Sequence, residues 1–346
     1  QKQFNGMILN IKKLTSGAHL LKAVSRRYRR FVSAFTNALL FFSLLPSYRS
    51  IARGKQWQYA RYLELSNKFE TQYRLAQNQN ETKYIVPQWQ GHLERLEKEM
   101  LPCPPFNFLT NPSIAFTMVP NVRGRWPATQ LSFLEKKLPP ETLRMLLGEE
   151  YMGKPRLMYR DYKTSHNAIH TLYHLEMFRQ TTNVDPSSLN HIVEWGGGYG
   201  TMAHMYAKLN PRSTYVLIDT TFMACLQWLY LATVLKDSNR VHLITGPGQE
   251  IAEGCISIIP VGFLKDYTLT ADLFISTWAL SESSTAALDL VIEKKWFNAK
   301  HFLFASQVAE EGFPGAIKLL KNLEGAGTKI ESIEYIPRNR NFYIFK

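Results

Sequence analysis

The stretch HIVEWGGGYGTMAHMYAKL, residues 191–209, places four glycines between an apolar segment and a segment with helical periodicity. The first five residues are typical of a short buried strand, and residues 201–209 are typical of a helix. Glycine permits positive φ and close approach of a ligand, and a helix start offers free N–H groups. The spacing Glu194-x-Gly196-x-Gly198-x-Gly200 therefore predicts a site for a nucleoside-bearing cofactor.

An acidic residue stands at the end of the next apolar segment. Residues 214–219, TYVLID, predict a second strand that ends at Asp219, nineteen residues after Gly200. A carboxylate at such a strand end can accept hydrogen bonds from both hydroxyls of a ribose. Gly198, Gly200 and Ala203 also satisfy the G-x-G-x-x-A fingerprint of dinucleotide-binding proteins, so the glycines alone do not exclude NAD.

Strand-like and helical segments alternate from residue 191 onward. After the segments already named come a helix at 221–235, a strand at 271–277 and a strand at 301–308. Two apolar runs within 241–262 compete for the third strand. Residues 328–337 and 339–345 predict two strands joined by a turn at Arg338 and Asn339. The pattern indicates a parallel α/β sheet covered on both faces and closed by a C-terminal hairpin.

These features resemble the class I S-adenosylmethionine-dependent methyltransferases, which carry an acidic-Gly-x-Gly-x-Gly loop and an antiparallel seventh strand. Within that class, LLGEEYMGKP, HIVEWGGGYGTMAHMY, YVLIDTTFMACLQWLYL and ADLFISTWALSES are similar to the bacterial putative sugar O-methyltransferases. The likeness covers about residues 140–346. It implies a Rossmann-like seven-stranded sheet, S-adenosylmethionine as cofactor, and a sugar or other hydroxylated metabolite as acceptor.

The same resemblance assigns roles to particular residues. Gly196, Gly197, Gly198 and Gly200 would wrap the methionine and ribose portions of the cofactor. Glu194 would lie beneath the loop near the amino group, and Asp219 would bind the ribose. Thr220 would face the adenine, and Thr277 and Trp278 would border the methyl-donor side. Trp195 departs from the pattern because it is bulkier than the residue usually found between the acid and the glycines.

A hydroxyl acceptor needs a general base within hydrogen-bond reach. Glu282 follows Ser281 in the turn after the strand at 271–277, where plant small-molecule O-methyltransferases carry a His-Asp pair, so we expect Glu282 to be the base. The alternative is a carboxylate that only stabilises a helix N-terminus. His166 is the second candidate.

His166, His170 and His174 are spaced four residues apart on the helix predicted before the glycine loop. Such spacing places them on one face and can hold a metal. No carboxylate cluster accompanies them, and magnesium prefers oxygen ligands, so we expect no metal site. The remaining interpretations are packing or solvent exposure of these rings, and a contact of His166 or His170 with substrate or cofactor.

The net charge of +13 is concentrated at the N-terminus, where no Asp or Glu precedes Glu64. A basic cluster there is followed by an apolar run, residues 31–45, which is too short for the roughly 20 residues of a membrane span. A core helix, a helix lying on an anionic membrane surface, a targeting segment and a nucleic-acid contact are the possible interpretations. Nucleic acid is the less favoured partner, and the sequence does not predict the oligomeric state.

Three regions are expected along the chain. Residues 1–100 form a basic, mainly helical region, residues 101–139 a proline-rich connector that is mostly extended or irregular up to residue 127, and residues 140–346 the methyltransferase domain. The chain has three cysteines, Cys103, Cys225 and Cys255. Their odd number argues against a full set of disulfides and their spacing does not match a metal site, which indicates reduced core thiols. We expect a cytoplasmic protein, peripheral to a membrane if the basic segment meets one.

Overall fold

The computed structural model describes residues 42–346 except 78, 119–125, 308–314, 326 and 334–340. Contacts divide the chain into two units, residues 1–50 and 51–346. In the first unit the described residues, 42–50, are helical. The basic cluster and most of the apolar run 31–45 lie outside the described residues, so their role stays a prediction. Within the described residues, no helix combines the length and apolarity that crossing a bilayer requires.

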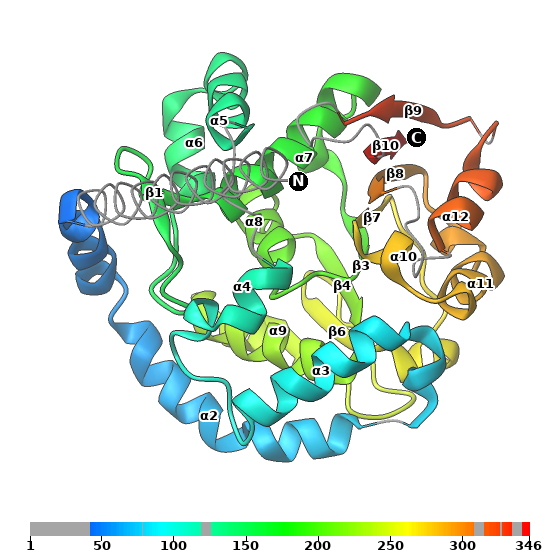
Figure 1. Cartoon of the computed structure of the whole chain (residues 1–346), viewed down its shortest axis with the longest axis horizontal. Coiled ribbons are helices and arrows are strands. Elements are labelled where there is room, and N and C mark those ends of the chain that lie inside the picture. The colour runs from blue at the N-terminus through cyan, green and yellow to red at the C-terminus, as the bar shows by residue number, and fades with distance from the viewer. Residues whose placement is uncertain (1–41, 78, 119–125, 308–314, 326, 334–340) are drawn as a thin grey trace, which may run out of the picture. The chain divides into compact units, whose positions relative to one another are not determined.

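An eight-stranded sheet organises the second unit (Figure 1). The chain enters it at β3 (His191–Trp195) and continues with the neighbouring strand β4 (Thr214–Asp219). The edge strand β5 (Val241–Leu243) comes next, followed by β6 (Ile256–Pro260), which lies between β4 and β5. The chain then returns to the other side of β3 with β7 (Leu273–Thr277) and β8 (His301–Gln307). All neighbouring pairs among these six strands are parallel.

The last two strands close the sheet in the antiparallel sense. β10 (Asn341–Phe345) lies between β8 and β9 (Lys329–Ser332) and is antiparallel to both. The predicted C-terminal hairpin is therefore confirmed, while its turn at Arg338 and Asn339 lies outside the described residues. Both apolar runs of 241–262 form strands, because β6 pairs with β4 and β5 adds to the outer edge of β6, so the sheet has eight strands where seven were expected.

Alternate residues of the strands contribute to two separate hydrophobic cores. Ile192 and Leu217 face a core shared with α7 (His166–Thr182), α8 (Thr201–Leu209) and α9 (Thr221–Val234). Val193 and Ile218 face the opposite core, which contains α11 (Thr285–Glu293) and α12 (Gly315–Leu323). Strands buried on both faces need continuous apolar runs, which explains sequences such as HIVEW and TYVLID.

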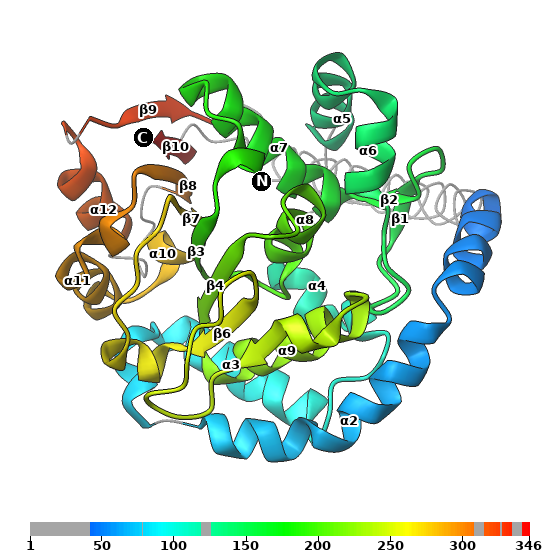
Figure 2. The ribbon, with the colours of Figure 1, turned by 180° about the vertical axis from the view of Figure 1, so that it is seen from behind.

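All fourteen residues of α9 are buried. A helix that is apolar all round needs cover on every side, and α9 lies between the sheet and α2 (Trp57–Ala76) (Figure 2). From α2, Leu65, Phe69 and Tyr73 are buried, and the Tyr73 ring meets Phe222 of α9 with centroids 6.2 Å apart. The N-terminal helices therefore form a third layer of the same unit.

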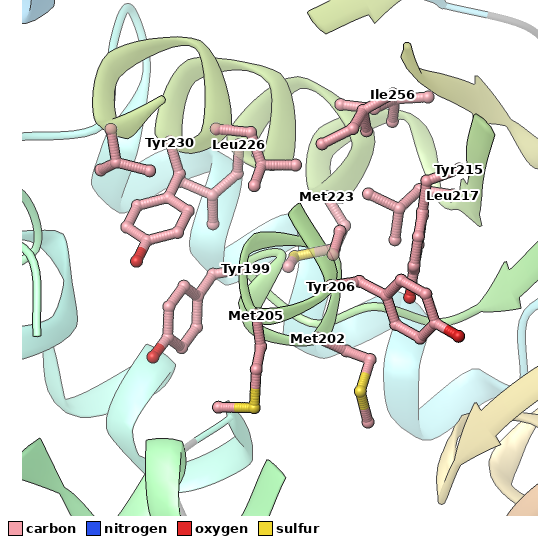
Figure 3. Close-up of a cluster of buried hydrophobic side chains, with 14 of the residues drawn as sticks. Tyr199, Met202, Met205, Tyr206, Tyr215, Leu217, Met223, Leu226, Tyr230 and Ile256 are labelled. Atoms are coloured by element: carbon pink, nitrogen blue, oxygen red, sulfur yellow. The ribbon is translucent and has the colours of Figure 1, made fainter. Parts of the chain in front are cut away.

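Aromatic and sulfur side chains fill the space around α8. Tyr215 of β4 and Tyr230 of α9 lie on opposite sides of this helix, and Met202 and Met205 project from the helix itself (Figure 3). Tyr206 meets Tyr215 with ring centroids 5.5 Å apart. This packing fixes α8, and with it the end of the glycine loop.

A buried ionic cluster ties α2 to α8. Glu150 accepts a hydrogen bond from Gln58 Nε2 at 2.6 Å and forms ion pairs with Lys55 at 2.7 Å and Lys208 at 3.5 Å, and His204 Nε2 lies 3.3 Å from its Oε1. Burial alone would raise the pKa of Glu150, but His204, Lys55 and Lys208 hold it well below its usual range. Removal of one partner would leave a buried charge unpaired, which makes such a cluster sensitive to mutation.

Four further helices precede the sheet in the chain. They are α3 (Pro87–Met100), α4 (Pro112–Met118), α5 (Trp126–Lys137) and α6 (Pro140–Leu147), with a short ribbon of β1 (Leu157–Tyr159) and β2 (Thr164–Ser165). The expectation that residues 101–127 are mostly extended or irregular is corrected in part, because 112–118 and the residues from Trp126 onward are helical. Proline is favoured in the first turn of a helix, where no backbone donor is lost, so Pro112 begins α4 instead of preventing it.

Candidate active site

The glycine loop is a tight turn between β3 and α8. Gly196 donates to the Ile218 carbonyl oxygen at 2.9 Å, and Gly200 donates to that of Gly197 at 2.8 Å. Gly196 has φ of +75°, and a Cβ there would lie 2.0 Å from Ala279 Cβ. Gly198 has φ of +57° and faces open space, with no atom within 4 Å of a Cβ. The loop thus needs glycine at Gly196 for packing and leaves room above Gly198 for a ligand.

Glu194 lies beneath this loop with 1% of its surface exposed. Its Oε2 accepts a hydrogen bond from the Tyr215 hydroxyl at 2.8 Å. Burial raises the pKa of Glu194 to about 8, and nearby Asp219 adds to the rise, while the Tyr215 hydrogen bond acts in the opposite direction. The ionised carboxylate is therefore short of a positive partner, which a ligand ammonium group would supply.

Asp219 ends β4 at the same edge of the sheet. Its oxygens accept from the Thr220 N–H at 2.8 Å and from Gln227 Nε2 at 2.7 Å. Burial raises the pKa of Asp219 to about 7. Gln227 Nε2 also donates to the Gly198 carbonyl oxygen at 2.8 Å and so joins the loop to the carboxylate. Gln227 is not among the predicted site residues, although an amide inside the apolar run TFMACLQWLYLATV is a signal for it.

A cavity of about 290 Å³ opens above the loop. Of the predicted site residues, the following line it: Glu194, Gly196, Gly197, Gly198, Asp219, Thr220, Thr277, Trp278 and Glu282. Gly200 is not among the lining residues, since it precedes α8 as its N-cap, packed against Leu231. The structure therefore brings Glu282 and the predicted cofactor residues to one cavity.

Trp278 follows β7 with φ of +75° and ψ of −41°. A bulky residue rarely adopts positive φ, and the strain is tolerated only where surrounding contacts enforce it. Here its backbone N–H donates to the Ala305 carbonyl oxygen at 2.6 Å, and His170 stacks near the indole with centroids 6.4 Å apart. The strained backbone places the indole in the cavity wall.

Glu282 is the last residue of the single-turn helix α10 (Ala279–Glu282). Gln307 Nε2 donates to its Oε1 at 2.8 Å, and Trp89 Nε1 donates to its Oε2 at 3.3 Å. Burial raises the pKa of Glu282 to about 7, and the Trp89 hydrogen bond acts in the opposite direction. A carboxyl group with a pKa near neutrality is suited to general-base catalysis.

The three histidines do not form a binding site together. His170 Nε2 lies 3.1 Å from His174 Nε2, and His174 Nδ1 lies 2.8 Å from the Tyr343 hydroxyl, beneath the indole of Trp278. Burial lowers the pKa of His170 to about 3 and that of His174 in the same direction. Both rings are therefore neutral packing groups that support the cavity wall.

His166, the second candidate for the base, begins α7, and the Ser165 side chain caps this helix by accepting a hydrogen bond from the Ala168 N–H. Burial, with Arg156, lowers the pKa of His166 to about 4. It is absent from the described lining of the cavity, to which α7 contributes Asn167 and Thr171. The described part of the chain holds no cluster of three metal-ligating side chains.

The N-terminal layer supplies a wall of the cavity that the sequence analysis did not identify. Together with two predicted residues it forms what we call the acceptor wall: Tyr84, Ile85, Val86, Trp89, Leu93, Thr117, Met118, Trp278 and Glu282. Trp89 and Glu282 are 193 positions apart in the sequence. No motif in residues 84–118 signals this role, because contacts over such separations depend on the whole fold.

The residues of the opposite wall fit S-adenosylmethionine. Thr220 Oγ1 is buried without a hydrogen-bond partner in the described structure, next to the Asp219 carboxylate. Open space lies above Gly198, and the Glu194 carboxylate lies below the loop. These groups match the needs of an adenine edge, a ribose and an ammonium group. The donor set therefore agrees with the cofactor that the resemblance implies.

The strand order, the antiparallel last strand and the acidic residue before the glycine loop match the Rossmann-like methyltransferase fold that the resemblance implies. The predicted fold class is thus confirmed. No protein-family model and no curated protein matches the chain.

Solved structures of methyltransferases are similar to the chain at low identity. Mitomycin 7-O-methyltransferase MmcR is 15% identical over 52% of this chain and 55% of its own, with a TM-score of 0.34. An O-methyltransferase family protein from Burkholderia thailandensis is 10% identical over 52% and 59%, with a TM-score of 0.33. Human N-acetylserotonin methyltransferase, solved with S-adenosylmethionine, is 14% identical over 72% of this chain and 74% of its own, with a TM-score of 0.33. The match spans less than two thirds of the first two proteins.

Replacing Gly196 by alanine is expected to disable the loop. The new Cβ would collide with Ala279 Cβ, and φ of +75° is unfavourable for alanine, so we expect a loss of roughly 1–3 kcal/mol in the free energy of unfolding and at least tenfold weaker binding of S-adenosylhomocysteine. Thermal unfolding and calorimetric titration measure both. Gly91→Ala in α3, where nothing lies within 4 Å of a Cβ, is the control. Unchanged binding by Gly196→Ala would contradict the assigned role.

Proposed function

We propose that the chain is an S-adenosylmethionine-dependent O-methyltransferase that acts on a hydroxylated small molecule. The observation that carries the proposal is the position of Glu282. Its carboxyl group lines the same cavity as the glycine loop and Asp219, it is held by Trp89 and Gln307, and burial raises its pKa to about 7. A base of this strength beside a methyl-donor site matches the need to remove a hydroxyl proton.

The residues of the cavity divide the work. The bound donor would supply an activated methyl group, whose carbon–sulfur bond breaks as the acceptor oxygen bonds to carbon, leaving S-adenosylhomocysteine. Glu194, Asp219 and the glycine loop orient the donor. Glu282 accepts the hydroxyl proton, while the acceptor wall excludes water and holds the acceptor oxygen in line with the transferred methyl group.

Three alternatives to this proposal are methylation of a sugar, methylation of RNA, and cofactor binding without catalysis. A sugar acceptor is implied by the resemblance and belongs to the same reaction class. RNA methylation was suggested by the basic N-terminus, but no Lys or Arg occurs among the described lining residues of the cavity, and phosphate binding relies on such residues. A binding domain without catalysis would hold the donor and transfer nothing. Contact of the basic region with an anionic membrane surface stays a separate prediction.

The proposal predicts that the full chain transfers label from methyl-labelled S-adenosylmethionine to a small-molecule fraction of a cell extract. Separate incubations with small-molecule, glycan, lipid and RNA fractions identify the acceptor class, with Glu282→Gln as the inactive control. Label that enters RNA alone would replace the proposal with the RNA alternative. Donor binding without transfer to any fraction would favour the non-catalytic alternative.

A further inference from the structure

The acceptor wall carries few polar groups that are free to hold a ligand. Thr117 Oγ1 donates to the Ser113 carbonyl oxygen at 3.0 Å, and the hydroxyl of Thr171, on the neighbouring face of α7, donates to the Asn167 carbonyl oxygen at 2.9 Å. Asn167 uses both amide hydrogens, on the Tyr199 hydroxyl at 2.8 Å and Thr201 Oγ1 at 3.0 Å. The side-chain hydrogens of Thr117, Thr171 and Asn167 are therefore already used within the protein and are not available to a polyhydroxylated ligand.

Apart from the hydroxyl of Tyr84, the other side chains of the acceptor wall are mainly apolar. They include Val86, Leu93, Met118 and the indoles of Trp89 and Trp278. The Trp89 N–H is also engaged, since it donates to Glu282 Oε2. Glu282 is the one carboxylate of this wall, and both its oxygens retain lone pairs that can accept a ligand hydroxyl.

The charge of the cavity lining further limits the class of acceptor. The chain contains 41 Lys and Arg residues, yet none lies among the described residues of the cavity lining. A phosphorylated or carboxylated acceptor would therefore meet Glu282 without a compensating cation. A sugar ring could stack on the indoles, but its remaining hydroxyls would be buried without partners, which is costly.

From the acceptor wall we infer that the acceptor is an uncharged phenol. Its ring lies among the apolar side chains, and its hydroxyl donates a hydrogen bond to Glu282. This inference rests on the proposed O-methyltransferase function and narrows its substrate class. A comparison of the pKa values of the two possible hydroxyl types with that of Glu282 supports a phenol. A phenol has a pKa of about 10, like tyrosine, whereas alkyl hydroxyls lie closer to water at about 16. Burial raises the pKa of Glu282 to about 7, which leaves a much smaller gap to a phenol.

The test compares matched acceptors with the full chain and methyl-labelled S-adenosylmethionine: 2-naphthol, cyclohexanol, methyl glucoside and glucose 6-phosphate. We expect kcat/KM for 2-naphthol to exceed that for each of the other three at least tenfold. Calorimetry should also show 2-naphthol binding to the S-adenosylhomocysteine complex, and methyl glucoside not binding to it. Preferred transfer to methyl glucoside or to the phosphate would overturn the inference while the proposed function stands. Donor binding with no transfer to any acceptor would overturn both.

Variants of the acceptor wall give a second readout. Trp89→Ala and Leu93→Asn should raise KM for 2-naphthol about tenfold or more, and Leu93→Asn should leave the affinity for S-adenosylhomocysteine within about twofold of wild type. Trp57→Ala, which removes a partly exposed indole from α2 away from the cavity, is the matched control and should change neither value. An unchanged KM in both wall variants would show that the acceptor does not contact this wall and would contradict the inference.

Discussion

Replacement of Glu282 by glutamine should lower turnover by about 10²–10⁴, the usual contribution of a general base, and leave the affinity for the methyl donor nearly unchanged. The amide keeps the size of the side chain but cannot take a proton at neutral pH. Single-turnover transfer of labelled methyl groups measures the loss, and titration with S-adenosylhomocysteine measures donor binding. Glu293→Gln, at an exposed position at the end of α11, is the matched control.

Two further variants make this result specific. His166→Ala should keep its activity, since His166 is absent from the described cavity lining. Gln307→Leu removes the donor to Glu282 Oε1 and should lower kcat more than it changes KM. If His166→Ala loses turnover while Glu282→Gln keeps it, the base is on α7 and our assignment is wrong.

The same assignment fixes the sign of the pH dependence. Because burial raises the pKa of Glu282 to about 7, the carboxylate form is populated only as the pH rises through that value. We expect kcat/KM to increase roughly tenfold per pH unit below pH 7 and to level off above it. A profile that is flat between pH 5 and pH 7 would contradict the role of Glu282 as base.

Asp219→Ala should remove most of the stabilisation of the protein by S-adenosylhomocysteine. A ligand at 100 times its Kd stabilises the folded state by about 2.7 kcal/mol, and loss of the ribose carboxylate should remove most of that gain. NAD should stabilise neither protein. Thermal unfolding with and without each ligand is the measurement, and Asp266→Ala, at an exposed position outside the cavity lining, is the control. Stabilisation by NAD alone would identify a dinucleotide-binding protein instead.

The sheet and the loop could be predicted because each depends on local sequence. β3, β4 and α8 begin and end at the expected residues, since apolar runs and glycines determine them over a few positions. The choice between the two runs in 241–262 could not be made in advance. Both are apolar, and only pairing in the folded sheet shows that each forms a strand.

The acceptor wall could not be predicted from the sequence. Trp89 reaches Glu282, and Gln307 reaches the same carboxylate from β8, although nothing near either residue in the sequence marks it as part of a site. The function of His170 was likewise ambiguous, because helical spacing alone is the same for a metal ligand and for a packed ring. Burial beneath Trp278 favours packing.

The third layer has a consequence for how the protein is made. Tyr73 of α2 is synthesised well before Phe222, its partner on α9. At about 5–20 residues per second, a ribosome takes roughly 7–30 s to cover the intervening segment of about 150 residues. During that time the apolar face of α2 has no partner from α9. The nascent chain should therefore be prone to aggregation until α9 emerges, and it is a natural client for chaperones that bind exposed apolar helices.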